Sequence, residues 1–212
     1  MGGFYREAGA CSAAAGAGCL DVLEWLHAQK PRCWTGTSIV AAARGGHLAV
    51  LKWIRTIQRS MYVDIHVCAA AAQGGHLEVL KWLRTKVPRT WHSPCPWDTL
   101  TCEGAAKGGH VEMMRWLRAQ VPPCPWDARS CDAASGMDNL EMLQCLRAQQ
   151  PPCPWDSFAC AAATREGHLK TLQWLRAQTP PCPWDTDSCT SAARGGHLDT
   201  LKWLRAQTPP CL

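Results

Sequence analysis

The sequence predicts an all-α fold, an α-solenoid of about seven stacked helix-turn-helix repeats with little or no β structure. The main observation is a tripeptide, Gly-Gly-His or Glu-Gly-His, whose last position recurs at a regular distance. That position is occupied in turn by Cys19, His47, His76, His110, Asn139, His168 and His197. Successive copies lie 28, 29, 34, 29, 29 and 29 residues apart. Such spacing is typical of solenoids, in which each unit buries its apolar face only against its neighbours.

Each unit is predicted to contain a helix of about eight residues followed by one of about twelve. The first helix starts after an aspartate, whose carboxylate accepts backbone N–H groups at a helix start. The aspartates in this position are Asp64, Asp98, Asp127, Asp156 and Asp185. The glycine pair ends the first helix, and a proline pair stops the second. Within the second helix apolar residues recur at helical spacing, as at Leu198, Leu201, Trp203 and Leu204.

These markers predict one repeat domain that covers residues 1–212. The approximate repeats are 1–35, 36–63, 64–97, 98–126, 127–155, 156–184 and 185–212. The chain begins almost at once in a predicted helix and stops at Pro-Pro-Cys-Leu, before another first helix. Solenoids usually need polar capping repeats, so end-to-end self-association is one expectation for this chain.

Composition narrows the class of protein. The chain is 47% apolar and 18% charged, which indicates a globular protein, and its net charge of +5 permits but does not require acidic partners. The N-terminus lacks a signal peptide pattern, and no apolar run approaches the ~20 residues of a membrane span. We therefore expect no membrane contact and an intracellular, cytoplasmic location, in which the 14 cysteines are free thiols.

Six units resemble the ankyrin repeat, five of them with its histidine in place, whereas the first, AAAGAGCLDVLEWL, lacks that histidine. The matching segments are AAARGGHLAVLKWI, AAAQGGHLEVLKWL, GAAKGGHVEMMRWL, AAATREGHLKTLQWL and SAARGGHLDTLKWL. The Trp- and Cys-rich form, with CPWD between units, looks like the variant ankyrin arrays of large DNA viruses and some eukaryotic microbes. Its units are shorter than the family's roughly 33 residues, and a proline-rich link replaces the β-hairpin. The resemblance implies a non-catalytic protein–protein interaction scaffold with a protein partner, in the host cytoplasm if the chain is viral.

The histidines of the recurring tripeptide favour architecture over chemistry. A catalytic or metal-binding histidine would be expected once, with its own partners, whereas these recur with the same neighbours. We therefore predict that each one satisfies backbone groups of the turn. No enzyme activity, catalytic residue, metal or cofactor is expected.

Cysteines form two series. The first-helix cysteines lie eight residues before the histidine position: Cys11, Cys68, Cys102, Cys131, Cys160 and Cys189. The joint cysteines follow the prolines: Cys33, Cys95, Cys124, Cys153, Cys182 and Cys211. Structural zinc commonly uses C-x2-4-C pairs, whereas the closest recurring spacing here is C-x6-C, as in Cys124 and Cys131. We favour buried packing, with metal binding and disulfides as the weaker alternatives.

Tryptophan and aspartate complete the recurring CPWD joint. We predict that its Asp starts a helix, its Pro shapes the link, and its Cys and Trp fill the seam between neighbouring units. A second tryptophan series is expected in the core of the second helices: Trp25, Trp53, Trp82, Trp116, Trp174 and Trp203.

Arginines near the ends of the second helices carry the alternative function, polyanion or nucleic-acid binding. They are Arg55, Arg84, Arg118, Arg147, Arg176 and Arg205. A stripe of such cations could follow a phosphate backbone and would bind in a salt-dependent way. We favour a structural interpretation, because cations suit helix C-termini and Glu78–Lys81 and Glu112–Arg115 can pair at i,i+3.

Positions that differ between otherwise similar units are the best partner-binding candidates. One group lies early in the first helices: Thr99, Leu100, Glu103, Arg129, Asp132, Phe158, Asp187 and Thr190. Another precedes the glycine pair: Arg44, Lys107, Arg165 and Arg194. Trp91 and His92 lie in a five-residue insertion of the third unit, which is either a binding loop or a neutral insertion.

Overall fold

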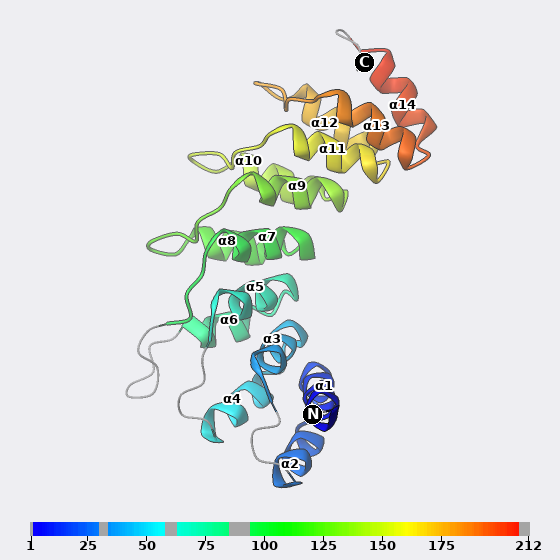
Figure 1. Ribbon diagram of the computed structural model, residues 1–212. Coiled ribbons are helices and arrows are strands. Elements are labelled where there is room, and N and C mark those ends of the chain that lie inside the picture. The colour runs from blue at the N-terminus through cyan, green and yellow to red at the C-terminus, as the bar shows by residue number, and fades with distance from the viewer. Residues whose placement is uncertain (1, 30–33, 58–62, 85–93, 208–212) are drawn as a thin grey trace.

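The computed structural model describes residues 2–29, 34–57, 63–84 and 94–207. Within these ranges the chain forms fourteen helices and no strand, so the predicted all-α solenoid is confirmed. Figure 1 shows the helix pairs stacked in one direction, with the two termini at opposite ends of the array. The predicted residues Trp91 and His92 lie outside the described residues.

The helices alternate between two rows. The first helices of the units are α1 (Gly2–Ala17), α3 (Gly36–Gly45), α5 (Ile65–Gln73), α7 (Thr99–Gly108), α9 (Ala128–Gly136), α11 (Ser157–Arg165) and α13 (Thr186–Arg194). The second helices are α2 (Leu20–Gln29), α4 (Leu48–Ile57), α6 (Leu77–Arg84), α8 (Val111–Arg118), α10 (Leu140–Arg147), α12 (Leu169–Ala177) and α14 (Leu198–Arg205). Each first helix packs against the next first helix, from α1 through to α13.

The predicted start and end of the first helix are confirmed. The Oδ1 atom of Asp98 accepts the Leu100 N–H at 2.9 Å, and that of Asp156 accepts the Phe158 N–H at 2.9 Å. The second glycine of the pair adopts a left-handed conformation, as at Gly109 with φ 75°. A side chain is disfavoured there, yet the fifth unit places Asp138 in the same position with φ 53°.

The second helices are shorter than predicted, at 8 to 10 residues instead of about twelve. Their last carbonyls bond to the joint instead of to a further helical turn. The Cys124 N–H donates to the Leu117 carbonyl at 3.1 Å, and the Cys153 N–H donates to the Leu146 carbonyl at 3.1 Å. The chain therefore leaves the helix before the proline pair is reached.

The core lies between the two rows of helices. It contains alanines and cysteines from the first helices and aliphatic side chains from the second, such as Leu80, Leu117 and Leu143. The prediction that the helix tryptophans lie in this core is wrong in degree. Five of them are half-buried and pack against the core, whereas Trp25 is 63% exposed.

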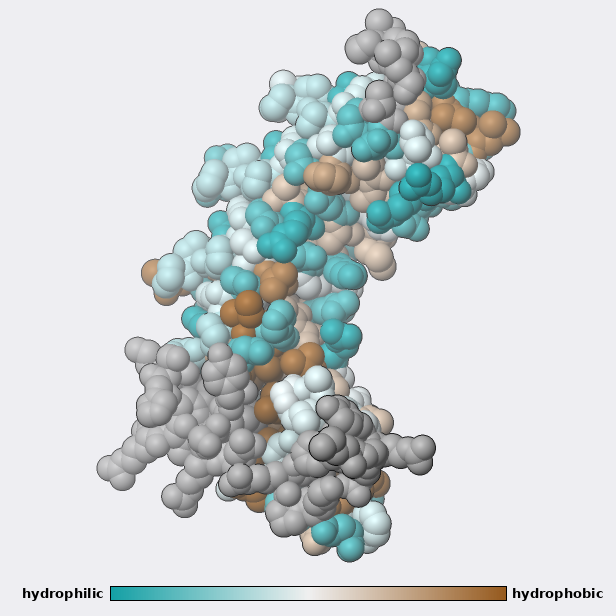
Figure 2. Space-filling model, in the orientation of Figure 1, coloured by the Kyte–Doolittle hydropathy of each residue, from teal (hydrophilic) through white to brown (hydrophobic). Residues whose placement is uncertain are grey.

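Surface hydropathy differs along the array. Figure 2 shows hydrophobic surface over the part of the molecule where α3 to α6 lie, and mainly hydrophilic surface beyond it except near the C-terminal end. In the last unit Leu198 is 60% exposed, although it belongs to the predicted apolar stripe. None of the described helices is both long enough and apolar enough to cross a membrane.

Candidate interaction surface

Histidines at the recurring position connect successive units. The Nε2 atom of His110 lies 3.1 Å from the Gln73 carbonyl oxygen, and that of His168 lies 3.2 Å from the Gly136 carbonyl oxygen. Each acceptor belongs to the last turn of the preceding unit's first helix. Asn139 also crosses its seam, but to a different acceptor, the carbonyl of Gly109 just after α7, at 3.5 Å. The predicted structural role is thus confirmed, and the structure adds that the bond crosses the seam between units.

The joint tryptophan bridges two units. The guanidinium of Arg118 lies over the Trp126 ring, 3.8 Å from its centroid, within one unit. In the preceding joint, the Trp97 ring meets the ring of Trp116 in the next unit edge to face, with centroids 6.1 Å apart. The prediction that this tryptophan fills the seam is confirmed.

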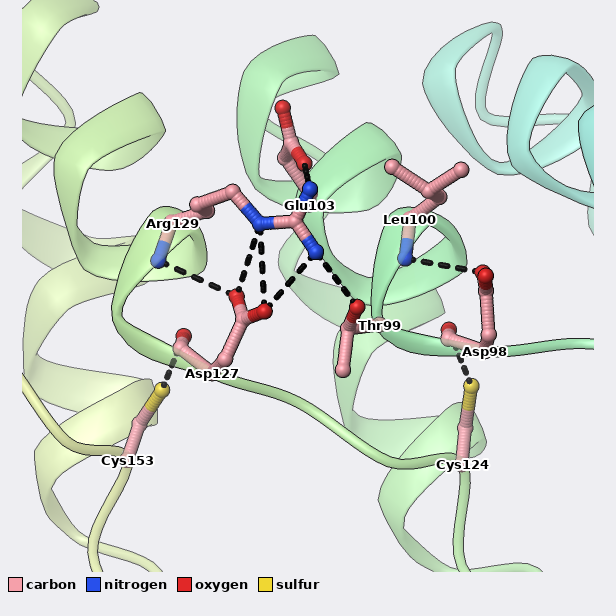
Figure 3. A network of polar contacts seen from close by, with 8 residues as sticks. All are labelled: Asp98, Thr99, Leu100, Glu103, Cys124, Asp127, Arg129 and Cys153. Carbon is pink, nitrogen blue, oxygen red and sulfur yellow. Dashed lines mark hydrogen bonds and ion pairs between the residues drawn. The ribbon is translucent and has the colours of Figure 1, made fainter.

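The joint cysteine closes its own unit, which differs from the seam position predicted for it. The Cys124 thiol donates to the Asp98 carbonyl at 3.6 Å, and the Cys153 thiol donates to the Asp127 carbonyl at 3.4 Å (Figure 3). Because each acceptor belongs to the residue that starts the unit's first helix, the joint ties both ends of a helix pair together.

The arginines of the second helices are built into these joints. Arg84, Arg118, Arg147 and Arg176 each stack on the joint tryptophan of their own unit. Each also donates to the carbonyl of the joint cysteine, at 2.5 to 2.7 Å. Exposed pairs occur as predicted between Glu78 and Lys81 at 2.8 Å and between Glu112 and Arg115 at 3.5 Å. These four arginines therefore serve the fold.

Two grooves lie along the face formed by the first helices. The first groove, of about 1070 Å³, is lined by α3, α5 and α7, and the second, of about 540 Å³, by α7, α9 and α11. Glu103 and Lys107 line both. The other predicted candidates in the first groove are Arg44 and Leu100, and those in the second are Arg129, Asp132, Phe158 and Arg165.

Arg129 links two units at the second groove (Figure 3). Its guanidinium binds Asp127 at 2.8 Å, donates to the Thr99 hydroxyl at 2.7 Å and lies 3.5 Å from Glu103. Three predicted candidates therefore form one network across α7 and α9. The Asp127 carboxyl has a lowered pKa despite partial burial, because the Arg129 guanidinium and backbone N–H stabilise its charged form.

Asp132 lies one turn further along α9, and burial raises its pKa to about 7. The negative charges of Asp156, Asp127 and Glu103 act in the same direction, and the positive charge of Arg129 opposes them. Its Oδ1 atom is buried and accepts no hydrogen bond within the described part of the chain. This carboxyl therefore keeps its proton to a higher pH than an ordinary aspartate does.

Hydrophobic and charged side chains meet in the second groove. Phe158 is 67% exposed there, and Met137 is 57% exposed. Sequence reasoning missed Met137, although its signal was present, because it replaces the first glycine of the pair. Asp187, Thr190 and Arg194 are also exposed, but they lie on α13 outside both grooves.

The described residues contain no cluster of three or more His, Cys, Asp or Glu side chains that could hold a metal ion. The described cysteines of both series are buried, as predicted, but the expectation of free thiols is wrong for Cys11, Cys68 and Cys95, which are disulfide-bonded. Cys68 and Cys95 are joined by a disulfide, since the first-helix and joint cysteines meet in the core of the unit.

The fold and the face together define a helical-repeat protein with a grooved surface. No protein-family model and no curated protein matches the sequence. Solved ankyrin-repeat structures are similar to it. The human ASB11 ankyrin repeat domain has a TM-score of 0.44 and 16% identity, with 77% of this chain and 80% of that chain covered. An ankyrin repeat family protein from Legionella pneumophila has a TM-score of 0.31 and 16% identity, with 92% and 70% covered.

Proposed function

We propose that this chain is a non-catalytic, ankyrin-like protein–protein interaction scaffold that binds its partner along the first-helix face. The observation that supports this most is the coincidence of the two grooves with positions that vary between units. The residues that repeat from unit to unit form the joints and the core, where their side chains contact other parts of the fold. Variable residues such as Glu103, Lys107 and Phe158 line the grooves instead.

The chemistry of the second groove favours a peptide or protein surface as the partner. An exposed phenylalanine beside charges of both signs can anchor an apolar side chain while polar groups fix its orientation. Arg129 is already held by Asp127, so the groove is organised before a partner arrives. We place this scaffold with the Trp- and Cys-rich ankyrin variants and in the cytoplasm, in a single domain of seven repeats.

Affinity capture from cell extract tests the surface. A groove variant with Lys107→Glu and Phe158→Asp is compared with wild type and with a control variant, Lys170→Glu with Gln173→Asp. Lys170 and Gln173 are exposed on α12, and both variants change the net charge equally. We expect one set of proteins to bind wild type and control and to be lost from the groove variant.

Salt separates this proposal from polyanion binding. Capture should persist at about 1 M salt, where charges more than about 3 Å apart are screened. Capture that disappears steeply with salt, together with release of nucleic acid, would support the alternative. Equal capture by all three proteins would contradict the groove as the binding surface.

A further inference from the structure

The two cysteine series meet inside single units. In the fourth unit the Cys102 thiol donates to the Cys124 carbonyl at 3.8 Å, and in the sixth the Cys160 thiol donates to the Cys182 carbonyl at 3.9 Å. Both pairs are separated by 22 residues. In each of these two units, the first-helix cysteine therefore lies next to the joint cysteine of the same unit.

The same arrangement occurs in two other units. In the fifth unit Cys131 and Cys153 occupy the same two positions, and both are fully buried. In the third unit the equivalent residues, Cys68 and Cys95, are joined by a disulfide, with Cα atoms 6.8 Å apart. Cα separations of about 4.4–6.8 Å are the range in which two cysteines can be bridged. Cys11, the first-helix cysteine of the first unit, is also disulfide-bonded, so the oxidised form occurs in the same array as the thiol pairs.

We propose that the thiol pairs Cys102–Cys124, Cys131–Cys153 and Cys160–Cys182 are oxidation sites that form a disulfide within each unit. The oxidant is a low-molecular-mass disulfide. One cysteine thiolate attacks it, releases one thiol and forms a mixed disulfide with the protein. The second cysteine then displaces the other half as a thiol. Each pair loses two hydrogen atoms, and the oxidant is reduced to two thiols.

Burial of the cysteines limits this reaction to moments when the unit opens. All six cysteines are fully buried, and burial together with the neighbouring thiol raises the pKa of Cys124, Cys153 and Cys160. The reactive thiolate is therefore scarce while a unit is closed. Exchange waits for the joint to open locally, which links oxidation of each pair to the opening of its own unit. Once formed, the disulfide encloses both helices of the unit and opposes further opening.

Mass spectrometry of the full chain tests the proposal. The reduced protein is incubated under native conditions with oxidised glutathione, remaining thiols are alkylated, and disulfide-linked peptides are mapped. We expect the three intra-unit links, with a mass loss of about 2 Da for each pair. The oxidised protein should have a higher melting temperature than the reduced one, and a reductant should reverse the change.

Two variants make the test specific. Cys124→Ala should lose the link to Cys102 and keep the links of the other two units. The matched control, Cys145→Ala, removes a buried cysteine from a second helix and should keep all three links. Far-UV circular dichroism reports whether each variant folds, and the wild-type map does not depend on either. Links between different units, stable glutathione adducts on the paired cysteines, or no mass loss would each overturn the proposal.

Discussion

At the scale of single residues, the joint concentrates several interactions on one arginine. The Arg147 guanidinium lies 3.8 Å from the Trp155 ring centroid and donates to the Cys153 carbonyl at 2.6 Å. Lysine keeps the positive charge, but its ammonium group is not planar, so it cannot stack on the tryptophan ring while it donates to the carbonyl. We expect Arg147→Lys to lower the free energy of unfolding by about 1–2 kcal/mol, measured by urea denaturation. The control Arg205→Lys, at an exposed position of the last unit, should have little effect.

The histidine that connects units offers a second test, because the chain contains its own replacement. His168 contacts the Gly136 carbonyl at 3.2 Å, and Asn139 crosses its own seam to the Gly109 carbonyl at 3.5 Å. His168→Ala leaves that carbonyl without its partner and should cost about 1 kcal/mol of unfolding free energy. His168→Asn should recover part of the loss. Equal urea midpoints for wild type and His168→Ala would show that the seam hydrogen bond contributes nothing.

Asp132 gives the stability a pH dependence of defined sign. Its pKa is about 7 in the folded chain and has an ordinary value of 3.8, so the folded state holds this proton more tightly. Its contribution to stability therefore falls as the pH rises from about 4 to about 7. After allowance for solvent screening, Asp132→Asn should stabilise the fold by about 1 kcal/mol at pH 8 and by almost nothing at pH 4.

Thermal unfolding of both proteins across this range checks the Asp132 prediction. Glu24→Gln, which removes an exposed carboxylate on α2, is the matched control and should show no such pH-dependent difference. A stabilisation by Asp132→Asn that is equal at both pH values would contradict the titration and indicate a packing effect.

At the scale of helices and joints, local chemistry made the first helices predictable and left the joints unpredictable. An aspartate cap and a left-handed glycine act on backbone groups a few residues away, so their patterns can be read directly. Arg118, at the end of α8, binds the carbonyl of Cys124 six residues later and stacks on the ring of Trp126 two residues beyond that. No pattern in the neighbouring sequence indicates these two contacts. Sequence reasoning therefore treated the arginines as helix-end cations and made the second helices too long.

The fifth unit breaks the tryptophan series and allows a gain-of-stability test. Trp155 pairs with Trp174 in the next unit, with ring centroids 6.4 Å apart. Trp126 occupies the same place in its joint, but the next unit has Cys145 where the others have tryptophan. Cys145→Trp should create the missing pair and raise the unfolding free energy by about 0.5–1.5 kcal/mol. The reciprocal change, Trp174→Cys, should lower it by at least as much.

Urea denaturation of these two variants distinguishes pairing from burial. If Cys145→Trp destabilises the protein while Trp174→Cys does too, the fifth unit lacks the space for an indole and overpacking decides the result. If both changes are neutral, the edge-to-face pairs seen at the other joints do not contribute to stability.

At the scale of the whole molecule, only the folded structure shows which partner-binding candidates lie together on one surface. Variation between units identified Glu103, Arg129 and Phe158 one at a time, because each occupies a variable position of its own repeat. Stacking of α7, α9 and α11 then brings them to one groove. The same stacking leaves Asp187 on α13 outside it. The register of the units predicted this face, but the depth of the grooves depends on side chains from three helices at once.

The array also predicts how stability is distributed along the chain. Central units are packed on both sides, whereas the end units of these 212 residues have one neighbour each, and their side chains Trp25 and Leu198 are 63% and 60% exposed. In a solenoid, each unit depends on its interfaces with its neighbours. We expect amide hydrogen exchange to be fastest in α1, α2, α13 and α14 and slowest in α7 to α10. Uniform protection along the chain would mean that the array opens as a single cooperative unit, and the local opening that the thiol pairs require would then be absent.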